Sequence, residues 1–262
     1  MKGYVNLPNS LFSISGKTAL VTGGSRGIGK MIAEGFVKAG VKTYISSRKA
    51  DVLLEVSKEL SNFGECIALP ANLASEEECR SLSEEISKRE DGIDILVNNA
   101  GATWGAPIDD FDEAAWERVL SLNVKSVFHL TKFLRPTLLK NATKEDPSRV
   151  INIGSIDGIQ VPVLETYSYS ASKAAVHQLT KHLAKKLAPE ITVNAIAPGP
   201  FESKMMAATL EAFGDEIAKM APLKRIGRPD DMAGTAIFLA SRAGSYLTGA
   251  IIPVDGGIAT LR

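Results

Sequence analysis

Two patterns of apolar residues follow one another in turn along the chain. Short runs rich in β-branched and apolar residues predict buried strands, and longer stretches with apolar residues three or four positions apart predict amphipathic helices. The expected strands are 17–22, 41–46, 65–69, 93–97, 149–154, 191–197 and 250–254. The expected helices run from the glycines after the first strand to residue 39 and over 50–62, 75–89, 111–139, 169–188 and 229–241.

Regular alternation of strand and helix predicts one α/β domain over 1–262, a Rossmann-like doubly wound parallel sheet of about seven strands flanked by helices. The dinucleotide-binding half is expected at about 15–150, and the catalytic and substrate half at about 150–258. The segment between the sixth strand and Pro222 is expected to be a mobile connection.

Composition narrows the class of protein. The 262 residues are 45% hydrophobic and 23% charged, with 30 Lys and Arg against 30 Asp and Glu. This balance argues against a nucleic acid or an anionic membrane as partner. Cys66 and Cys79 have no metal-ligand or redox spacing, and no apolar run is long enough to cross a bilayer. We expect a soluble cytoplasmic protein without a metal site.

A glycine-rich turn follows the first strand directly and leads into a helix. Glycines let the backbone turn tightly and approach a pyrophosphate, whose charge is held by free N–H groups at the helix N-terminus. The spacing is G-x-x-x-G-x-G, and its setting between strand and helix predicts a dinucleotide site. The expected cofactor-binding residues of the turn are Gly23, Ser25, Arg26, Gly27, Ile28 and Gly29.

The end of the second strand indicates which nucleotide binds. An NAD site usually carries Asp or Glu here for the ribose 2′-hydroxyl. This chain has Ser47 and Arg48 instead, and Arg26 lies in the glycine turn. Two guanidinium groups without a carboxylate suit a 2′-phosphate, so the sequence favours NADP(H) over NAD(H). Small residues at the end of the fourth strand, Asn99, Ala100 and Gly101, are also expected beside the cofactor.

A phenol and an ammonium group are brought together in the fifth helix. Tyr169 and Lys173 are four residues apart and share one helix face. A nearby positive charge favours the phenolate and should lower the tyrosine pKa from about 10. The pair therefore predicts a general acid and base. Tyr167 is the local competitor, but no lysine lies one turn beyond it, and it is expected to line the mouth of the substrate pocket.

Two other motifs point to different chemistry. Residues 23–27 fit G-x-S-x-G, the nucleophile elbow of α/β-hydrolases, but a hydrolase needs a histidine on a later loop. The three histidines, His129, His177 and His182, all fall inside predicted helices. Residues 170–173 fit S-x-x-K of β-lactamases, whose companion motifs are absent. The sequence therefore favours neither a hydrolase nor a β-lactamase.

Six landmarks in order resemble the short-chain dehydrogenase/reductase family over about residues 15–258. They are Thr22–Gly29, Asn98–Gly101, Asn123, Ser155, Tyr169–Lys173 and Pro198–Gly199. Within the family, the runs 98–105 and 149–155 are most similar to β-ketoacyl reductases of the rhamnolipid-pathway type.

The resemblance implies a catalytic tetrad. Tyr169 would exchange a proton with the substrate oxygen, and Ser155 would hydrogen-bond that oxygen. Lys173 would lower the tyrosine pKa and bind the nicotinamide ribose, while Asn123 would anchor a water that links Lys173 to solvent. Asn72 and Leu73 would contact adenine, and Pro198, Gly199 and Phe201 would orient the carboxamide.

The resemblance also implies substrate and assembly. Apolar residues would surround the substrate carbonyl, which suits a hydrophobic ketone or acyl chain; they are Trp104, Ile156, Val161, Tyr167, Met205 and Met206. Helices 111–139 and 169–188 would form the contacts of a homotetramer. The expected activity is NADPH-dependent reduction of an apolar ketone or 3-oxoacyl thioester to the secondary alcohol. The alternatives are an NAD-dependent secondary alcohol dehydrogenase working oxidatively, and a cofactor-sensing regulator without turnover.

Overall fold

A parallel seven-stranded sheet forms the centre of the molecule, as the sequence predicts. The computed structural model describes residues 11–202 and 207–261. The strand order is β3-β2-β1-β4-β5-β6-β7, and every neighbouring pair is parallel. The strands are β1 (Thr18–Thr22), β2 (Lys42–Ser46), β3 (Cys66–Ala68), β4 (Ile95–Asn98), β5 (Ser148–Ile153), β6 (Ile191–Pro198) and β7 (Ile251–Val254). The predicted fold class is confirmed.

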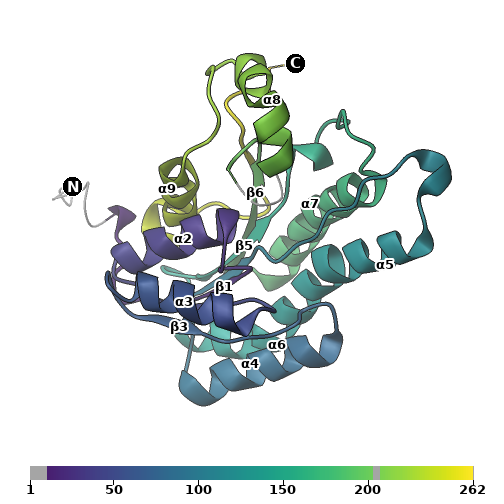
Figure 1. Cartoon of the computed structure of the whole chain (residues 1–262). Helices are drawn as coiled ribbons and strands as arrows, with labels where there is room; N and C mark the ends of the chain where they lie inside the picture. Colours follow the sequence, from purple (N-terminus) through teal and green to yellow (C-terminus); the bar gives the residue numbers. More distant parts are fainter. Residues whose placement is uncertain (1–10, 203–206, 262) are drawn as a thin grey trace.

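Helices cover both faces of the sheet (Figure 1). They are α2 (Gly27–Lys38), α3 (Ala50–Leu60), α4 (Glu76–Arg89), α5 (Glu113–Leu120), α6 (Ser126–Asn141), α7 (Tyr167–Leu187), α8 (Ala207–Met220) and α9 (Pro229–Ala240). One core cluster joins α2, α3 and α9 to the sheet, and a second joins α4, α6 and α7 to it. In β1, Ala19 and Val21 belong to the first cluster and Leu20 to the second, because successive side chains of a strand point to opposite faces.

Two helical segments differ from the prediction. The helix expected over 111–139 is divided into α5 and α6 by a π-helical segment, Ser121–Lys125, which contains Asn123. The connection expected to be mobile before Pro222 contains α8 instead, which stands apart from the two layers at the top of Figure 1. Its apolar positions 210, 213, 217 and 220 have helical spacing, and this signal was missed.

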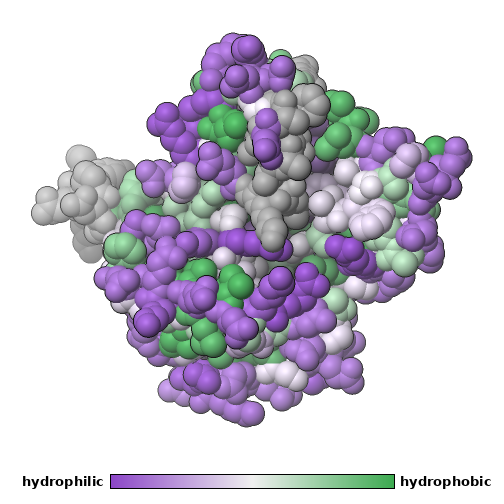
Figure 2. All heavy atoms as spheres, viewed as in Figure 1, coloured by the Kyte–Doolittle hydropathy of each residue, from purple (hydrophilic) through white to green (hydrophobic). Residues whose placement is uncertain are grey.

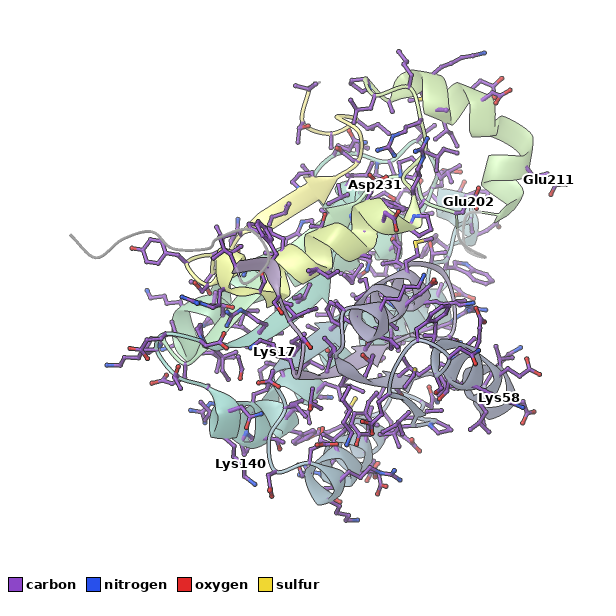
Figure 3. The ribbon with its side chains drawn as sticks, turned by 90° about the vertical axis from the view of Figure 1, so that its left-hand side faces the viewer. Lys17, Lys58, Lys140, Glu202, Glu211 and Asp231 are labelled. Atoms are coloured by element: carbon purple, nitrogen blue, oxygen red, sulfur yellow. The ribbon has the colours of Figure 1, made fainter. Side chains whose placement is uncertain are left out.

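The strand order fixes the position of a ligand site. The chain leaves β1 toward β2 on one side of the sheet, and β4 pairs with β1 on the other. Ligands of open α/β sheets bind beside the carboxyl ends of the strands at such a switch in strand order. Lys17 precedes β1 and Glu202 follows β6, and Figure 3 shows these two residues well apart.

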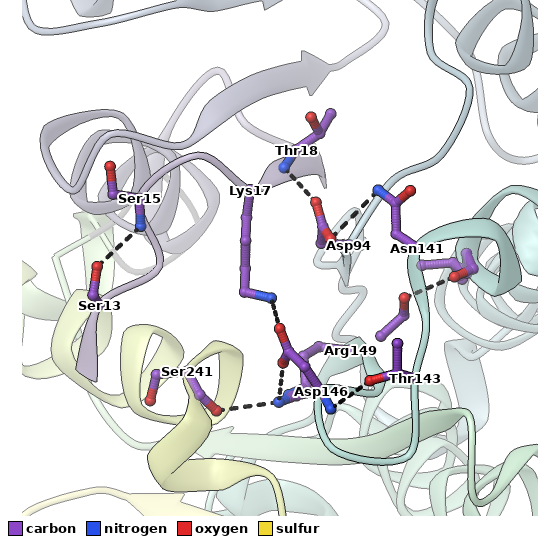
Figure 4. Close-up of polar contacts among 12 residues, drawn as sticks. Ser13, Ser15, Lys17, Thr18, Asp94, Asn141, Thr143, Asp146, Arg149 and Ser241 are labelled. Atoms are coloured by element: carbon purple, nitrogen blue, oxygen red, sulfur yellow. Dashed lines mark hydrogen bonds and ion pairs between the residues drawn. The ribbon is translucent and has the colours of Figure 1, made fainter. Parts of the chain in front are cut away.

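A polar network closes the opposite, amino-terminal edge of the sheet (Figure 4). Asp146 accepts hydrogen bonds from the Lys17 ammonium at 2.8 Å and from Nη2 of Arg149 at 3.1 Å. Nη2 of Arg149 also lies 3.3 Å from the Ser241 carbonyl oxygen. The network ties β5 to the start of β1 and to the end of α9, far along the strands from the expected ligand site.

Hydrophilic residues cover most of the face seen in Figure 2, with smaller hydrophobic patches between them. Among the described residues, no helix combines the length and the apolar character needed to cross a membrane.

Candidate active site

The glycine turn is packed too closely for larger residues. Gly23 and Gly27 have φ values of +67° and +52°, which side chains rarely adopt. A Cβ atom at Gly29 would lie 2.4 Å from the carbonyl oxygen of Gly23. Arg26 has extended backbone just before α2, so the first N–H groups of the helix face the turn. This is the close-packed backbone that a pyrophosphate cradle requires.

Asn99 holds this turn in place. Its Nδ2 donates to the carbonyl oxygen of Thr22 at 2.8 Å, and its backbone N–H donates to Oγ1 of Thr22 at 2.9 Å. The N–H of Ala100 donates to the same hydroxyl at 3.0 Å. The side chain of Asn99 is therefore engaged with β1, so its contribution to a nucleotide site is to position the turn, a role that the sequence did not indicate.

The end of β2 offers unpaired polar groups. Ser47 Oγ is buried and has no hydrogen-bond partner among the described residues. Arg48 follows it in the chain, and both Arg48 and Arg26 of the glycine turn are exposed. A buried hydroxyl without a partner is costly, and a ligand oxygen would satisfy it. The glycine turn and Ser47 together fit a dinucleotide, with two guanidinium groups free to bind a phosphate. Across the sheet edge, Asn72 is exposed and Leu73 is buried.

The chain after β6 passes close to β7. The N–H of Gly199 donates to the Val254 carbonyl oxygen at 3.0 Å, and a Cβ on Gly199 would lie 2.7 Å from that of Asp255. The Phe201 ring is 2% exposed and packs on Gly227, so only its backbone could face a ligand. A cavity of about 410 Å³ borders Phe201 and Asp255, but none of the four predicted catalytic residues lines it.

Ser155 ends β5 and begins a short 3₁₀ turn, Ile156–Gly158. Its backbone is extended, and its Oγ accepts a hydrogen bond from the N–H of Asp157 at 3.1 Å. The preceding Gly154 packs closely on α7, because a Cβ there would lie 2.2 Å from Nε2 of His177. The Ser155 hydroxyl is thus fixed at the carboxyl end of a central strand.

Tyr169 and Lys173 lie in the first turns of α7, close to Ser155. The Lys173 ammonium nitrogen is 5.5 Å from the centroid of the Tyr169 ring and donates to the Ile153 carbonyl oxygen at 2.8 Å. Lys173 is 6% exposed, and burial lowers its pKa to about 8. The ammonium is therefore held beneath the phenol by the carbonyl group of Ile153, the last residue of β5.

The expected lowering of the Tyr169 pKa is wrong for this structure. Burial raises the pKa of Tyr169 to about 12; the Ser155 hydroxyl acts to lower it, and the charge of Asp157 acts to raise it further. Loss of hydration disfavours a phenolate more than its neighbours favour one. At neutral pH the phenol is protonated, which is the form that can donate a proton.

Asn123 lies beside this group without touching Lys173. Its Nδ2 donates to the Ala102 carbonyl oxygen and to Oγ of Ser172, both at 2.9 Å, and its Oδ1 accepts from the N–H of Ala102 at 2.8 Å. The π-helical segment turns this buried amide toward the loop after β4 and toward α7. The side chain joins three elements at the residue before Lys173.

Asp157 is a charged residue of the site that the sequence analysis missed. It is half-buried two residues after Ser155, and its charge acts on both Tyr169 and Lys173. Burial raises its pKa, and Lys173 opposes this rise. An acidic residue between a predicted strand and the Tyr169 helix was the available signal.

The residues expected to bind substrate are spread around the mouth of the site. Trp104 is 41% exposed and carries the Arg118 guanidinium 5.4 Å from its ring, while Val161 is 90% exposed. The Tyr167 hydroxyl donates to Glu165 Oε1 at 2.7 Å. Ile156 instead is buried in a small apolar cluster with Ala221 and Ile258. Met205 and Met206 lie outside the described residues.

These features occur at one edge of one sheet. A close-packed glycine turn, a serine at a strand end and a tyrosine beside a buried lysine are the features of a dinucleotide-dependent oxidoreductase. Within residues 11–202 and 207–261, no three His, Cys, Asp or Glu side chains gather to hold a metal ion.

The chain is similar to known proteins over almost its whole length. The profile of the family described as enoyl-(acyl carrier protein) reductase matches residues 23–259. The rhamnolipids biosynthesis 3-oxoacyl-[acyl-carrier-protein] reductase of Pseudomonas aeruginosa is 47% identical, over 94% of this chain and 97% of its own. The 3-oxoacyl-[acyl-carrier-protein] reductase FabG of Aquifex aeolicus is 38% identical, over 94% of this chain and 98% of its own.

A solved structure, the Pseudomonas aeruginosa RhlG/NADP active-site complex, superposes with a TM-score of 0.93 at 45% identity, covering 96% of this chain and all of the other. The chain belongs to the short-chain dehydrogenase/reductase family, as the sequence motifs predict.

Proposed function

We propose that this protein uses NADPH to reduce an apolar ketone or a 3-oxoacyl thioester to the secondary alcohol. The observation that carries the proposal is the meeting of Ser155, Tyr169 and Lys173 at the sheet edge that also bears the glycine turn. The relatives named 3-oxoacyl-[acyl-carrier-protein] reductases and the neighbour solved with NADP support it.

Ser155 and Tyr169 would hold the carbonyl oxygen between two hydroxyl groups. Burial keeps Tyr169 protonated at neutral pH, with a pKa of about 12. As the carbonyl carbon gains a hydride, its oxygen becomes an alkoxide, which is about as basic as hydroxide. Proton transfer from the phenol to that oxygen is then downhill, so the resting protonation state suits reduction.

Lys173 would stabilise the phenolate that remains after proton transfer. Its ammonium nitrogen lies 5.5 Å from the phenol ring centroid, and a positive charge there favours the ionised oxygen. Its hydrogen bond to the Ile153 carbonyl oxygen fixes the direction of the side chain. Asn123 would hold α7 and the loop after β4 in register at Ser172.

The residues around the glycine turn would bind the nucleotide. The N–H groups at the start of α2 would face the pyrophosphate, Ser47 the adenosine ribose, and Arg26 and Arg48 the 2′-phosphate. The backbone of Gly199 and Phe201 would orient the carboxamide. When bound, NADPH supplies the hydride, and the chain supplies placement and the proton.

The substrate would enter past an apolar rim. Trp104 and Val161 expose apolar surface beside the site, which suits an acyl chain better than a polyol. The Arg118 guanidinium over Trp104 leaves one face of the indole for such a chain.

The test is NADPH oxidation measured across a panel of ketones that includes an acetoacetyl thioester. We expect the thioester and long-chain 3-oxo esters to be reduced with higher kcat/KM than short, polar ketones. No NADPH consumption with any member of the panel would contradict the proposed function, and indifference to the thioester would contradict the acyl substrate.

We also propose a homotetramer formed through α6 and α7, in a reducing cytoplasmic setting. Phe128 on α6 exposes 44% of its surface, which a subunit contact would cover. Cys66 and Cys79 are buried free thiols. Light scattering of the purified protein measures the subunit number.

A further inference from the structure

The backbone of Asp157 lies against the hydroxyl that would hold the substrate oxygen. The Ser155 hydroxyl that would hold the substrate oxygen already accepts a hydrogen bond from the N–H of Asp157 at 3.1 Å. A substrate oxygen within hydrogen-bond reach of Ser155 and Tyr169 is therefore a close neighbour of residue 157.

The direction of the Asp157 side chain follows from the packing of its turn. Ile156 points into the cluster with Ala221 and Ile258. Gly158 lies against the backbone of α7, because a Cβ there would be 2.7 Å from the carbonyl carbon of Lys173. Asp157, between them, is half-buried near the charge of Lys173 and the phenol of Tyr169.

The Asp157 carboxylate has no hydrogen-bond partner among the described residues. Its oxygens accept no hydrogen bond among the residues that the structure describes, although its backbone N–H does donate one. The titratable groups that face the turn from α7 are Tyr169, Lys173, His177 and Lys181, of which Lys181 borders Gly158 and Ile159 and not Asp157. Strand β6 also packs against the turn, and it has no titratable side chain. Lys173 is buried beneath Tyr169, so an incoming anion meets Asp157 first.

We propose that Asp157 selects substrates by charge: the site accepts carbonyl compounds whose reacting end is uncharged, such as an ester, amide or thioester of a 3-oxo acid, and rejects the free 3-oxo carboxylate. The inference rests on the proposed ketone reduction and goes further, because it assigns a specificity-determining residue and a chemical class of substrate. A 3-oxo carboxylate carries its negative charge only two carbons from the ketone, so a ketone held by Ser155 would bring that charge near Asp157.

Coulomb's law gives the size of the effect. Two like charges about 6–8 Å apart at an effective dielectric constant of about 20 disfavour binding by roughly 30- to 100-fold. Partial exposure of Asp157 weakens the repulsion, so we expect the wild type to prefer the neutral substrate by at least about tenfold more than a variant without the charge.

The experiment compares kcat/KM for ethyl acetoacetate and for acetoacetate, with NADPH, in three proteins. Asp157→Asn removes the charge and keeps the shape, and Asp110→Asn removes an exposed carboxylate of the short turn Ile108–Asp110 as a matched control. The ratio of ester to anion should fall at least about tenfold in Asp157→Asn and stay unchanged in Asp110→Asn.

A second measurement needs no variant. The ester-to-anion ratio of the wild type should decrease as the pH falls, because Asp157 becomes protonated above the ordinary Asp range, while the substrate carboxylate keeps more of its charge. An equal ratio in all three proteins and at all pH values would overturn the inference and leave ketone reduction intact. No turnover of either substrate by the wild type would overturn both.

Discussion

The ammonium nitrogen of Lys173 lies 5.5 Å from the ring centroid of Tyr169 and is held there by the Ile153 carbonyl oxygen at 2.8 Å. Both side chains lose hydration at this position, with opposite effects. Burial lowers the pKa of Lys173 to about 8 and raises that of Tyr169 to about 12. Near neutral pH the site therefore contains a protonated phenol above a charged amine.

This pair predicts the pH dependence of ketone reduction. Tyr169 keeps its proton up to about pH 12, whereas Lys173 loses its charge as the pH rises through about 8. Since both protonated forms are needed, kcat/KM should be level near pH 7 and fall by about tenfold per pH unit well above 8. A profile that stays level to pH 10 would show that Lys173 keeps its charge and would contradict the lowering of its pKa by burial.

Tyr169→Phe tests the proton donor directly. Removing a general acid should lower kcat by roughly 100- to 10,000-fold and leave the Kd for NADPH unchanged, because the ring remains in place. Tyr246→Phe is the matched control, since Tyr246 is fully exposed and lies outside the residues placed at the site. Steady-state kinetics with NADPH fluorescence titration measures both. Full activity in Tyr169→Phe would contradict the mechanism.

Gly29→Ala tests the phosphate cradle. The new methyl group would lie 2.4 Å from the Gly23 carbonyl oxygen and from Nδ2 of Asn99, so the turn must open. We expect NADPH affinity to fall at least about tenfold, because a loss of that size corresponds to one charge-assisted hydrogen bond. Gly234→Ala on α9, where nothing lies within 4 Å of the added atom, should keep the affinity of the wild type. Equal affinities would show that the turn is not at the nucleotide.

Arg48→Ala tests the choice of nucleotide. Arg48 is exposed just after β2, next to Ser47, whose hydroxyl has no hydrogen-bond partner in the described part of the chain. Loss of a guanidinium from a 2′-phosphate should reduce kcat/KM with NADPH by roughly 10- to 100-fold and change that with NADH little. Lys49→Ala, one residue further, serves as the control for a change of net charge. A matching decrease with both nucleotides would point to damage to the fold.

The strands and the main site follow from short-range patterns in the sequence, whereas the order of the strands comes from the folded structure. Alternating apolar runs fix the strands, and the spacing of Tyr169 and Lys173 places both on one helix face. Three features needed the folded structure. The rise of the Tyr169 pKa depends on burial, which the folded chain creates. The hydrogen bonds of Asn99 to Thr22 depend on the pairing of β1 with β4. The approach of Asp157 to Lys173 depends on how a turn packs on α7.

The network at the other edge of the sheet should contribute to stability and not to catalysis. Arg149 is 1% exposed, burial lowers its pKa, and its Nε and Nη1 have no partner among the described residues. Asp146 supplies the compensating charge at 3.1 Å. Asp146→Asn would leave a buried guanidinium without its counter-charge, and since the Asp146 side chain is 42% exposed we expect a loss of about 1–3 kcal/mol in the free energy of unfolding.

Replacing both charges tells ion pairing apart from simple loss of contacts. Arg149→Met combined with Asp146→Asn removes the buried charge and keeps an apolar stem in its place, so most of the lost stability should return. Urea unfolding measures the two variants, and kcat/KM for ketone reduction should match the wild type in both, because the network lies at the amino ends of the strands. A double variant less stable than Asp146→Asn would show that Arg149 stabilises the fold through its other contacts, such as the Ser241 carbonyl oxygen, rather than through its pairing with Asp146.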